Sequence, residues 1–248
     1  MIGAIRAEFR KLLSIRSTYI LIGVAVAFVV LYAFFIEGYK LTGGDLHNPH
    51  LVTNDVTSAL GSLPMIFGAI IAVLLMTHEY RYNTIMYTLV SSRSRSKVLF
   101  AKIVAVTIFG LLFTVLIGVL TPVLSYAGVA LHGHTLIAQV IDYKSLVWRS
   151  LFGGWTFITT GLLLATLIRS QIGAIVSLFA IPIFEQILGL LLKHNTVYLP
   201  FTAQGAILTS PRPEQGTITY AHAALVFSIY LIVGWIVAWI LFLKRDAN

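Results

Sequence analysis

One acid in the sequence is unusual because it lies inside an apolar run. Glu185 belongs to the run 172–192, next to Gln186 and three residues after Pro182. A carboxylate in an apolar environment is costly unless it has a partner, water or a proton. Glu185 and Gln186 are therefore candidates for a substrate path or a subunit seam, with a structural role near the outer end of the run as the alternative.

Two histidine pairs are the next candidates for chemistry. His47 lies near His50 and His132 lies near His134, so each pair could contribute to a metal site. Neither pair belongs to an H-E-x-x-H array, and the sequence has no cysteine that could add a thiolate ligand. We therefore expect this chain to bind no metal ion and no cofactor.

The composition places these residues in a membrane protein. The 248 residues are 58% hydrophobic and only 10% charged, whereas soluble domains are roughly 25% charged. The mean hydropathy is +0.91. The net charge of +8 could indicate nucleic-acid binding, but the basic residues lie in short stretches between apolar runs, where they act as topology signals. We therefore expect no nucleic-acid partner.

Six apolar runs predict an all-α integral membrane protein with one domain, residues 1–248. Each run is long enough to cross a hydrocarbon core of roughly 30 Å as a helix. The third run is the longest, so it must tilt, kink at Pro122 or protrude. Small residues four apart allow helices to approach closely, and they occur at Gly23/Ala27, Gly68/Ala72, Gly161/Ala165, Gly173/Ser177 and Gly234/Ala238. The predicted spans are 19–36, 59–77, 103–129, 147–168, 172–192 and 223–243.

The distribution of Lys and Arg predicts the orientation of these spans. An even number of spans places both termini on one side, and that side holds twelve of the 17 Lys and Arg residues. The other side holds Lys40, Lys144, Arg149, Lys193 and Arg212. Because cytoplasmic segments carry the excess of positive charge, both termini and the connection 77–102 are expected in the cytoplasm.

Residues 1–17 predict an amphipathic helix that lies in the membrane interface. One side carries Ile2, Ile5, Phe9, Leu12 and Leu13, and the other carries Arg6, Arg10, Lys11 and Ser14. Such a helix would turn its basic side toward the headgroups of anionic membrane lipids. The alternative is a plain basic flank that only fixes the topology.

The connection between the second and third spans contains a second short amphipathic pattern, at 79–90. Tyr82, Ile85, Met86 and Leu89 share one helical face, and Arg81, Thr84 and Thr88 share the opposite one. One face could then pack on the spans while the other contacts a soluble protein. A solvated topology loop is the alternative interpretation.

This segment resembles the signature of the ABC-2-type permeases, a family of ATP-driven exporters. The resemblance rests on Glu79-Tyr80-Arg81-x-x-Thr84-Ile85-x-x-Thr88-Leu89, followed by Ser92-Arg93 and Lys102. Glu8-x-x-Lys11-Leu12-x-Ser14-x-Arg16-Ser17 is similar to the amphipathic N-terminal helix of the family. Asn83 stands where the family commonly has Gly, and Asn also tolerates left-handed backbone geometry.

The resemblance extends to the connection between the last two predicted spans. Leu199-Pro200-Phe201-Thr202-Ala203 is similar to the re-entrant segment that these permeases place there. The apolar centre of this connection, 203–208, is too short to cross a bilayer. A re-entrant or surface helix is therefore expected between the fifth and sixth spans.

Membership of this family implies a transport subunit that depends on other proteins. The chain would pair with a second permease copy, identical or related, in a prokaryotic cytoplasmic membrane, and with two cytoplasmic ATPase subunits that bind ATP and Mg. The sequence contains no G-x-x-x-x-G-K-[ST] phosphate loop of its own. By resemblance, the residues that couple the permease to the ATPase are Glu79, Arg81, Thr84, Ile85, Thr88, Leu89 and Arg93.

Two other classes of protein remain as alternatives. An intramembrane protease or lipid-modifying transferase would need Ser with His, paired acids or metal ligands within its helices. Glu185 is the only acid inside a predicted span, so the spans do not supply the paired acids that such an enzyme could use. An ion-driven carrier would be expected to place more paired charges within its spans.

Overall fold

The computed structural model describes residues 2–36, 49–61, 63–92, 94–131, 133, 141–209 and 218–244. Every regular element in these ranges is a helix, so the all-α prediction is confirmed. The elements are α1 (Ile2–Ser14), α2 (Arg16–Val29), the π-helical η1 (Val30–Ile36), α4 (Pro49–Gly61), α5 (Leu63–Arg81), α6 (Ile85–Ser92), α7 (Arg95–Leu131), α8 (Tyr143–Ile168), α9 (Gln171–Leu192), the 3-10 helix η4 (Lys193–Tyr198), α10 (Pro200–Leu208) and α11 (Tyr220–Lys244).

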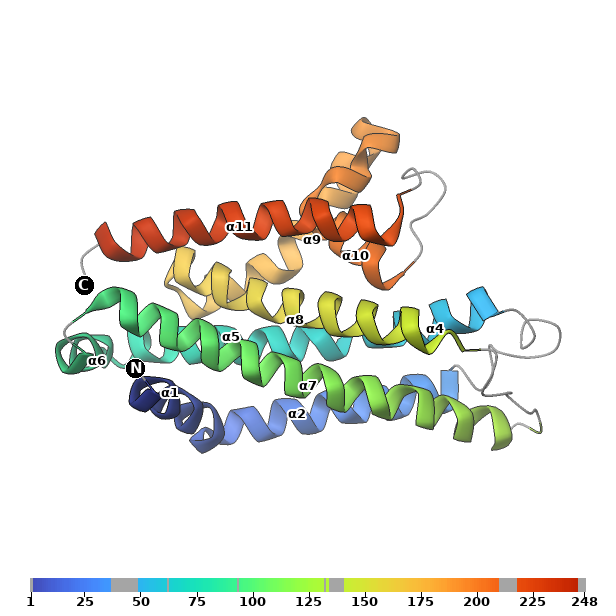
Figure 1. Ribbon diagram of the computed structural model, residues 1–248, viewed down its shortest axis with the longest axis horizontal. Helices are drawn as coiled ribbons and strands as arrows, with labels where there is room; N and C mark the ends of the chain where they lie inside the picture. Colours follow the sequence, from blue (N-terminus) through green and yellow to red (C-terminus); the bar gives the residue numbers. More distant parts are fainter. Residues whose placement is uncertain are drawn as a thin grey trace.

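The long helices form an elongated bundle with two distinct ends. Helices α2, α5, α7, α8 and α11 run roughly along its length (Figure 1). One end holds α1, α6 and the last turn of α11, whereas α4 and α10 lie toward the other end. We call the first of these the α1–α6 end.

Four helical segments are long and apolar enough to cross a membrane: Arg95–Leu131, Tyr143–Ile168, Gln171–Tyr198 and Tyr220–Lys244. A fifth follows if Ile2–Ser14 and Arg16–Tyr32, which meet at an angle of 66°, count as one broken span. Among the described residues, this test gives four or five spans where the sequence predicts six. The chain is a multi-pass membrane protein.

The region of the predicted second span, 59–77, is divided between two helices. Helix α4 ends at Gly61, and α5 begins at Leu63 and continues to Arg81. Helix α4 is an addition to the six predicted spans, and it packs between α8, α7 and α10. The predicted third span corresponds to α7, which begins at Arg95 and therefore extends beyond the apolar run at the α1–α6 end.

Small residues bring α5 and α8 into close contact at the centre of the bundle. A Cβ atom on Gly161 would lie 2.4 Å from the carbonyl oxygen of Ala69, and one on Gly68 would lie 2.8 Å from Ile158. The close approach predicted at Gly161 and Gly68 is thus confirmed, and larger residues there would force the helices apart. In agreement, 67% of the most apolar part of α8 is buried inside the protein.

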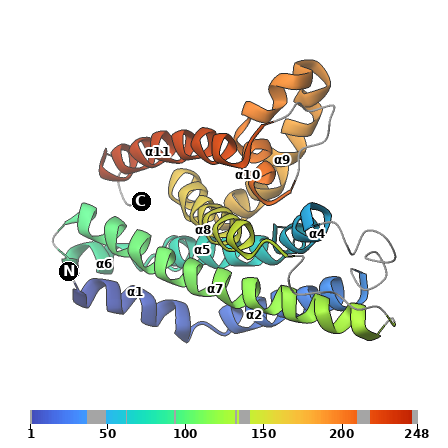
Figure 2. The ribbon, with the colours of Figure 1, turned by 45° about the vertical axis from the view of Figure 1, so that its right-hand side comes forward.

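Helix α9 lies at the periphery instead. It leaves the bundle at an angle, so its second half and η4 project away from the other long helices (Figures 1 and 2). Only 11% of its most apolar part is buried. The two-residue connection before it is fixed by Arg169, which ends α8 in the left-handed region at φ 57°, and by Ser170, whose side chain accepts a hydrogen bond from the Gly173 N–H.

Candidate functional site

Four charged side chains from three helices meet at the α1–α6 end. Glu8 and Lys11 come from α1, Glu79 from the last turn of α5, and Lys102 from α7. Lys102 Nζ lies 2.8 Å from Glu8 Oε2 and 3.1 Å from Glu79 Oε2. Lys11 Nζ lies 2.8 Å from Glu8 Oε1 and also pairs with Glu79. We call these residues the charge quartet.

The charge quartet is mostly buried and carries no net charge. Lys102 is 0% exposed, and Glu8 and Glu79 are also buried. Removing a charged group from water is expensive, so a buried charge is tolerated only when it is paired and hydrogen-bonded. Each carboxylate here lies between two ammonium groups and each ammonium lies between two carboxylates, which meets that condition.

The pKa values of the α1 members show which effect prevails. Burial alone would raise the pKa of Glu8, but the positive charges of Lys102 and Lys11 outweigh it and hold that pKa below its ordinary value. Burial alone would lower the pKa of Lys11, but Glu79 and Glu8 raise it above its ordinary value. Both groups therefore remain charged at neutral pH.

The charge quartet also reaches the short helix α6. Thr88 of α6 lies with its hydroxyl 3.4 Å from Glu79 Oε1. On the opposite side, Lys102 Nζ lies 3.4 Å from the carbonyl oxygen of Leu75 in α5. The quartet thus joins α1, α5, α6 and α7, the helices that gather at this end of the bundle.

The prediction of one helix at 79–90 is wrong, because the structure breaks this segment into two helices. Helix α5 ends at Arg81, and α6 begins only at Ile85. Between them Asn83 has a left-handed φ of 55°, which agrees with the tolerance expected of Asn at this position. The turn is closed by the Thr84 N–H, which donates to the Glu79 carbonyl over 2.9 Å.

Because of this break, the predicted faces of 79–90 are only partly right. Ile85 is buried as expected and Leu89 is partly buried. The sequence predicts Tyr82 and Met86 on the packed side, but both are exposed. Tyr82 lies in the turn, outside the helical period of α6, and within α6 the packed apolar residues are limited to Ile85 and Leu89. Tyr87 and Val90 are exposed as well, at 78% and 75%. We call Met86, Tyr87 and Val90 of α6, together with Tyr82 of the preceding turn, the α6 apolar face.

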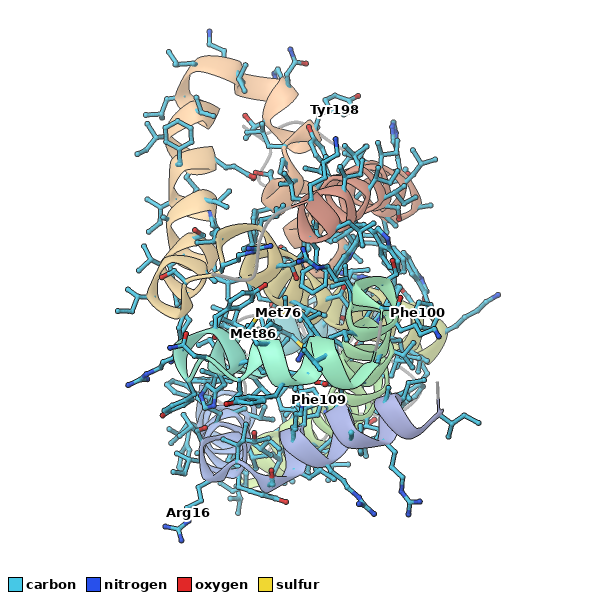
Figure 3. All side chains as sticks on the ribbon, turned by 90° about the vertical axis from the view of Figure 1, so that its left-hand side faces the viewer. Arg16, Met76, Met86, Phe100, Phe109 and Tyr198 are labelled. Atoms are coloured by element: carbon cyan, nitrogen blue, oxygen red, sulfur yellow. The ribbon has the colours of Figure 1, made fainter. Side chains whose placement is uncertain are left out.

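Figure 3 views the molecule from the α1–α6 end. Helices α1 and α6 lie crosswise over the ends of the long helices, with Met86 labelled on α6 and Arg16 projecting outward (Figure 3). Arg6 and Arg10 are exposed on α1, as the amphipathic pattern predicts. Lys11 was expected on that same basic side, but it turns inward to the charge quartet, because Glu8 and Glu79 supply a stronger partner than water.

The remaining residues predicted to couple the chain to an ATPase lie around α6. Arg81 is exposed, and its Nη1 lies 3.4 Å from Gln171 Oε1 at the start of α9. Thr84 is exposed in the turn before α6. Arg93 lies outside the described residues. The structure thus gathers the described members at one end but buries Glu79 beneath α6 rather than presenting it on the surface.

A second polar site lies toward the other end of the bundle, and it contains Glu185. Its Oε1 accepts a hydrogen bond of 2.9 Å from the Phe201 N–H, and its Oε2 accepts one of 2.7 Å from the Thr202 N–H. The Thr202 hydroxyl donates to Oε2 over 3.0 Å. Glu185 therefore caps the N-terminus of α10, where free N–H groups favour a negative charge. Its neighbour Gln186 is exposed.

Arg149 of α8 binds the opposite end of α10. Its Nε donates to the Ile207 carbonyl over 2.7 Å, and its Nη2 donates to the Leu208 carbonyl over 2.9 Å. Its Nη1 donates to Asn54 Oδ1 over 2.9 Å, and its guanidinium lies 3.9 Å from the centre of the Tyr220 ring. We call Glu185 and Arg149 the α10 clamp.

Sequence patterns do not single out Arg149, which is one of the five Lys and Arg residues assigned to the outer side. Arg149 lies inside the apolar stretch of the fourth predicted span, and a buried cation at such a position requires partners. That signal could have been used, but the partners could not be named from it. The two histidine pairs lie outside the residues whose side chains the structure describes.

Comparison with known protein families identifies the family of this chain. The sequence model of a family described as ABC-2 family transporter protein matches residues 4–189, which is well over half of the chain. The chain belongs to this family of membrane transport proteins. A comparison with curated proteins finds no match.

Proposed function

We propose that this chain is the membrane-spanning subunit of an ATP-driven exporter in a prokaryotic cytoplasmic membrane. The observation that carries the proposal is the position of α6. This helix lies across the α1–α6 end, outside the long bundle, and its apolar face is exposed. Directly beneath it, the charge quartet connects it to three other helices.

The α6 apolar face favours a protein partner. Exposed apolar side chains gathered beyond the membrane-spanning part of a protein mark sites of interaction. Tyr82 and Tyr87 are aromatic, and aromatic residues are enriched in the binding surfaces of proteins. Arg81 beside them adds a positive charge that an acidic partner could complement. A cytoplasmic ATPase subunit, with its own ATP and Mg, is the partner that the family membership suggests.

The charge quartet supports transmission of force from α6 to the spans. Glu79 and Lys102 tie the end of α5 to the start of α7, and Glu8 and Lys11 tie both to α1. Breaking one of these buried pairs would leave an uncompensated charge, so the helices move more easily as one body than apart. A displacement of α6 by the ATPase would therefore shift α5 and α7 together.

The finer topology is also part of this proposal. With α2–η1 and α5 added to α7, α8, α9 and α11, the chain crosses the membrane six times and places the α1–α6 end in the cytoplasm. The excess of Lys and Arg at that end supports this orientation. Helix α1 then lies in the interface, and α10 forms a re-entrant helix on the opposite side.

A second copy of the chain is proposed to pack against α9. This helix is barely buried, and its exposed residues include Ile172, Val176, Ile183 and Ile187. They follow one another at helical spacing, so they form one continuous stripe. A span that projects from its own bundle and carries such a stripe is suited to pack in a symmetric dimer.

Co-purification with a neighbouring-gene ATPase tests the proposal. Tagged wild-type protein is expected to recover the ATPase from detergent or nanodiscs. The double variant Tyr87→Glu/Val90→Glu is expected to lose it while remaining folded by size-exclusion profile. The matched control is Ile2→Glu, which changes an apolar residue that is 83% exposed at the same end. If no ATPase associates with the wild type, or if both variants behave alike, the proposed docking surface is wrong.

A further inference from the structure

A groove of about 710 Å³ lies on the side of the bundle between α7, α8 and α11. Its size falls within the range of roughly 300–1,000 Å³ that is typical of small-molecule sites. Its walls include Ile103 of α7 and three tryptophans, Trp155, Trp235 and Trp239. None of the residues proposed above to couple to an ATPase lines it.

The groove walls suit a hydrocarbon chain. The hydroxyls in the walls are largely occupied, because Thr156 donates to the Phe152 carbonyl over 2.7 Å, Thr159 to the Thr156 carbonyl over 2.9 Å and Ser228 to the Ala224 carbonyl over 2.7 Å. No charged residue lines this groove among the described residues. An apolar occupant would therefore take no hydrogen-bond partner from these three hydroxyls.

The groove is also reachable from the lipid phase. Ile232, Ile236 and Ile240 of α11 line it and are exposed at 60%, 55% and 46%. These residues follow one another in steps of four, so they form a stripe along one edge of the groove. A chain lying in the bilayer could enter from the side without passing through the protein.

Two basic residues, Arg95 and Lys244, follow the lining residues of the groove toward the α1–α6 end, and neither is itself a lining residue. The stripe of Ile236 and Ile240 continues by one further step of four to Lys244, which is exposed. On α7, Ile103 and Thr107 line the groove, and two steps of four back from Ile103, past the buried Leu99, lead to Arg95, which also lines a small pocket beside α6. Arg95 Nη1 donates to the Leu243 carbonyl over 3.2 Å, so it brings the two helices together at this mouth.

We propose that this groove binds an anionic membrane lipid, with an acyl chain between α7, α8 and α11 and its acidic headgroup at Arg95 and Lys244. The charge at the mouth selects an anionic headgroup, because each basic residue near a membrane surface favours anionic lipid. The apolar walls select the chain. This site requires that the protein lies in a membrane, but it does not require an ATPase.

Quenching of tryptophan fluorescence by brominated lipids tests the site directly. The chain has four tryptophans and three of them line the groove. In a Trp148→Phe background, only groove tryptophans would emit. In the first series, the purified protein is reconstituted into phosphatidylcholine vesicles with rising fractions of phosphatidylglycerol that is brominated on its acyl chains. In the second series, brominated phosphatidylcholine is added at the same rising fractions instead.

A reporter for ordinary surrounding lipid provides the control. In a chain with all four tryptophans changed to Phe, Leu112→Trp places one tryptophan on an exposed position of α7 outside the groove. Groove tryptophans are expected to be quenched at about 5-fold lower mole fraction by brominated phosphatidylglycerol than by brominated phosphatidylcholine, whereas the Leu112→Trp reporter shows no preference. The double variant Arg95→Gln/Lys244→Gln is expected to remove the groove preference while chain quenching persists.

Three outcomes would overturn the proposal. Equal quenching of the groove and reporter tryptophans by both lipids would mean that the groove is only part of the ordinary lipid boundary. No quenching in the groove would mean that another occupant, such as a second copy or a peptide, covers it. A preference for phosphatidylglycerol that survives Arg95→Gln/Lys244→Gln would mean that Arg95 and Lys244 do not bind the lipid headgroup.

Discussion

Glu185 and Arg149 bind opposite ends of the same nine-residue helix, α10. Glu185 accepts from the backbone N–H groups of Phe201 and Thr202, and Arg149 donates to the carbonyls of Ile207 and Leu208. A negative group at the N-terminus and a positive group at the C-terminus both stabilise a helix through its dipole. Because Glu185 comes from α9 and Arg149 from α8, the α10 clamp also fixes α10 relative to two long helices.

The first prediction concerns Glu185. Glu185→Ala removes the acceptor for two N–H groups and a hydroxyl, so it should lower stability by about 2 kcal/mol. Glu185→Gln retains one acceptor oxygen and should cost less. Thermal unfolding followed by size-exclusion fluorescence provides the measurement, and Gln186→Ala, at the exposed neighbouring position, is the control.

The same variants separate a structural role for Glu185 from a role in the substrate path. If capping is its role, a folded Glu185→Gln protein keeps its ATP-driven activity. A folded Glu185→Gln protein that has lost this activity, with unchanged thermal stability, would indicate that the carboxylate contacts substrate or a proton instead.

The second prediction concerns Arg149. Its three nitrogens bind three acceptors at once, which the planar guanidinium fork allows and an ammonium group does not. Arg149→Lys should therefore lower stability by about 3 kcal/mol, because two buried carbonyls lose their donors. Lys144→Gln, a loss of charge at an exposed position five residues earlier in α8, should have little effect. Equal stability of the two variants would contradict the clamp.

The third prediction concerns the charge quartet. Lys102→Met leaves two buried carboxylates with only Lys11 between them, and it should cost about 3–5 kcal/mol. The triple variant Glu8→Gln/Glu79→Gln/Lys102→Met removes both buried carboxylates and leaves only the part-exposed Lys11 charged, so it should recover part of that loss. The measurement is again thermal unfolding, and Arg10→Gln on the exposed side of α1 is the control.

The charge quartet also predicts a dependence on pH. The pKa of Glu8 lies below its ordinary value of 4.5, so its stabilising contribution is present above that pH and is lost as the pH falls through the lower pKa of the folded protein. Wild type should therefore lose stability below this pH more steeply than Glu8→Gln. Parallel pH curves for the two proteins would argue against the pairing of Glu8 with Lys102.

Several features of the fold could be predicted from sequence because they depend on local composition. The apolar runs of α8, α9 and α11 are bounded by polar residues, so their positions follow from length and hydropathy alone. The tolerance of Asn83 for a left-handed backbone also follows from its residue type, but the break that this turn makes in the helix predicted at 79–90 did not follow from the helical periodicity. In each of these cases the determining residues lie within the element itself.

The sites depended on contacts that no local pattern encodes. Glu185 pairs with N–H groups 16 and 17 residues away, and Lys102 pairs with Glu8 across 94 residues. Helical periodicity predicts Lys11 on the basic side of α1. Periodicity describes a single helix, so it cannot show that Glu79 of another helix approaches Lys11 and draws it inward. The direction of α9 away from the bundle likewise depends on packing between helices, which the single sequence leaves open.

The fourth prediction concerns the proposed dimer. The chain has no cysteine, so single cysteines can be introduced without further change. Ile183→Cys and Ile187→Cys, on the exposed stripe of α9, should form cross-linked dimers on mild oxidation in membranes. Leu112→Cys, equally exposed on α7, should remain monomeric. Dimers that form equally at all three positions would reflect random collision and would contradict packing through α9.

The central claim is that ATP hydrolysis in a partner moves the spans through α6 and the charge quartet. Helix α7 begins beside this quartet and ends at Leu131, so a single cysteine at Leu131 reports movement at the far end. The most direct measurement is the rate at which a maleimide labels Leu131→Cys in the ATPase complex, with and without ATP. We predict that ATP changes this rate several-fold, and that Glu79→Gln abolishes the change although the ATPase still associates. An unchanged rate in the unsubstituted complex, or an equal change with Glu79→Gln, would contradict the account.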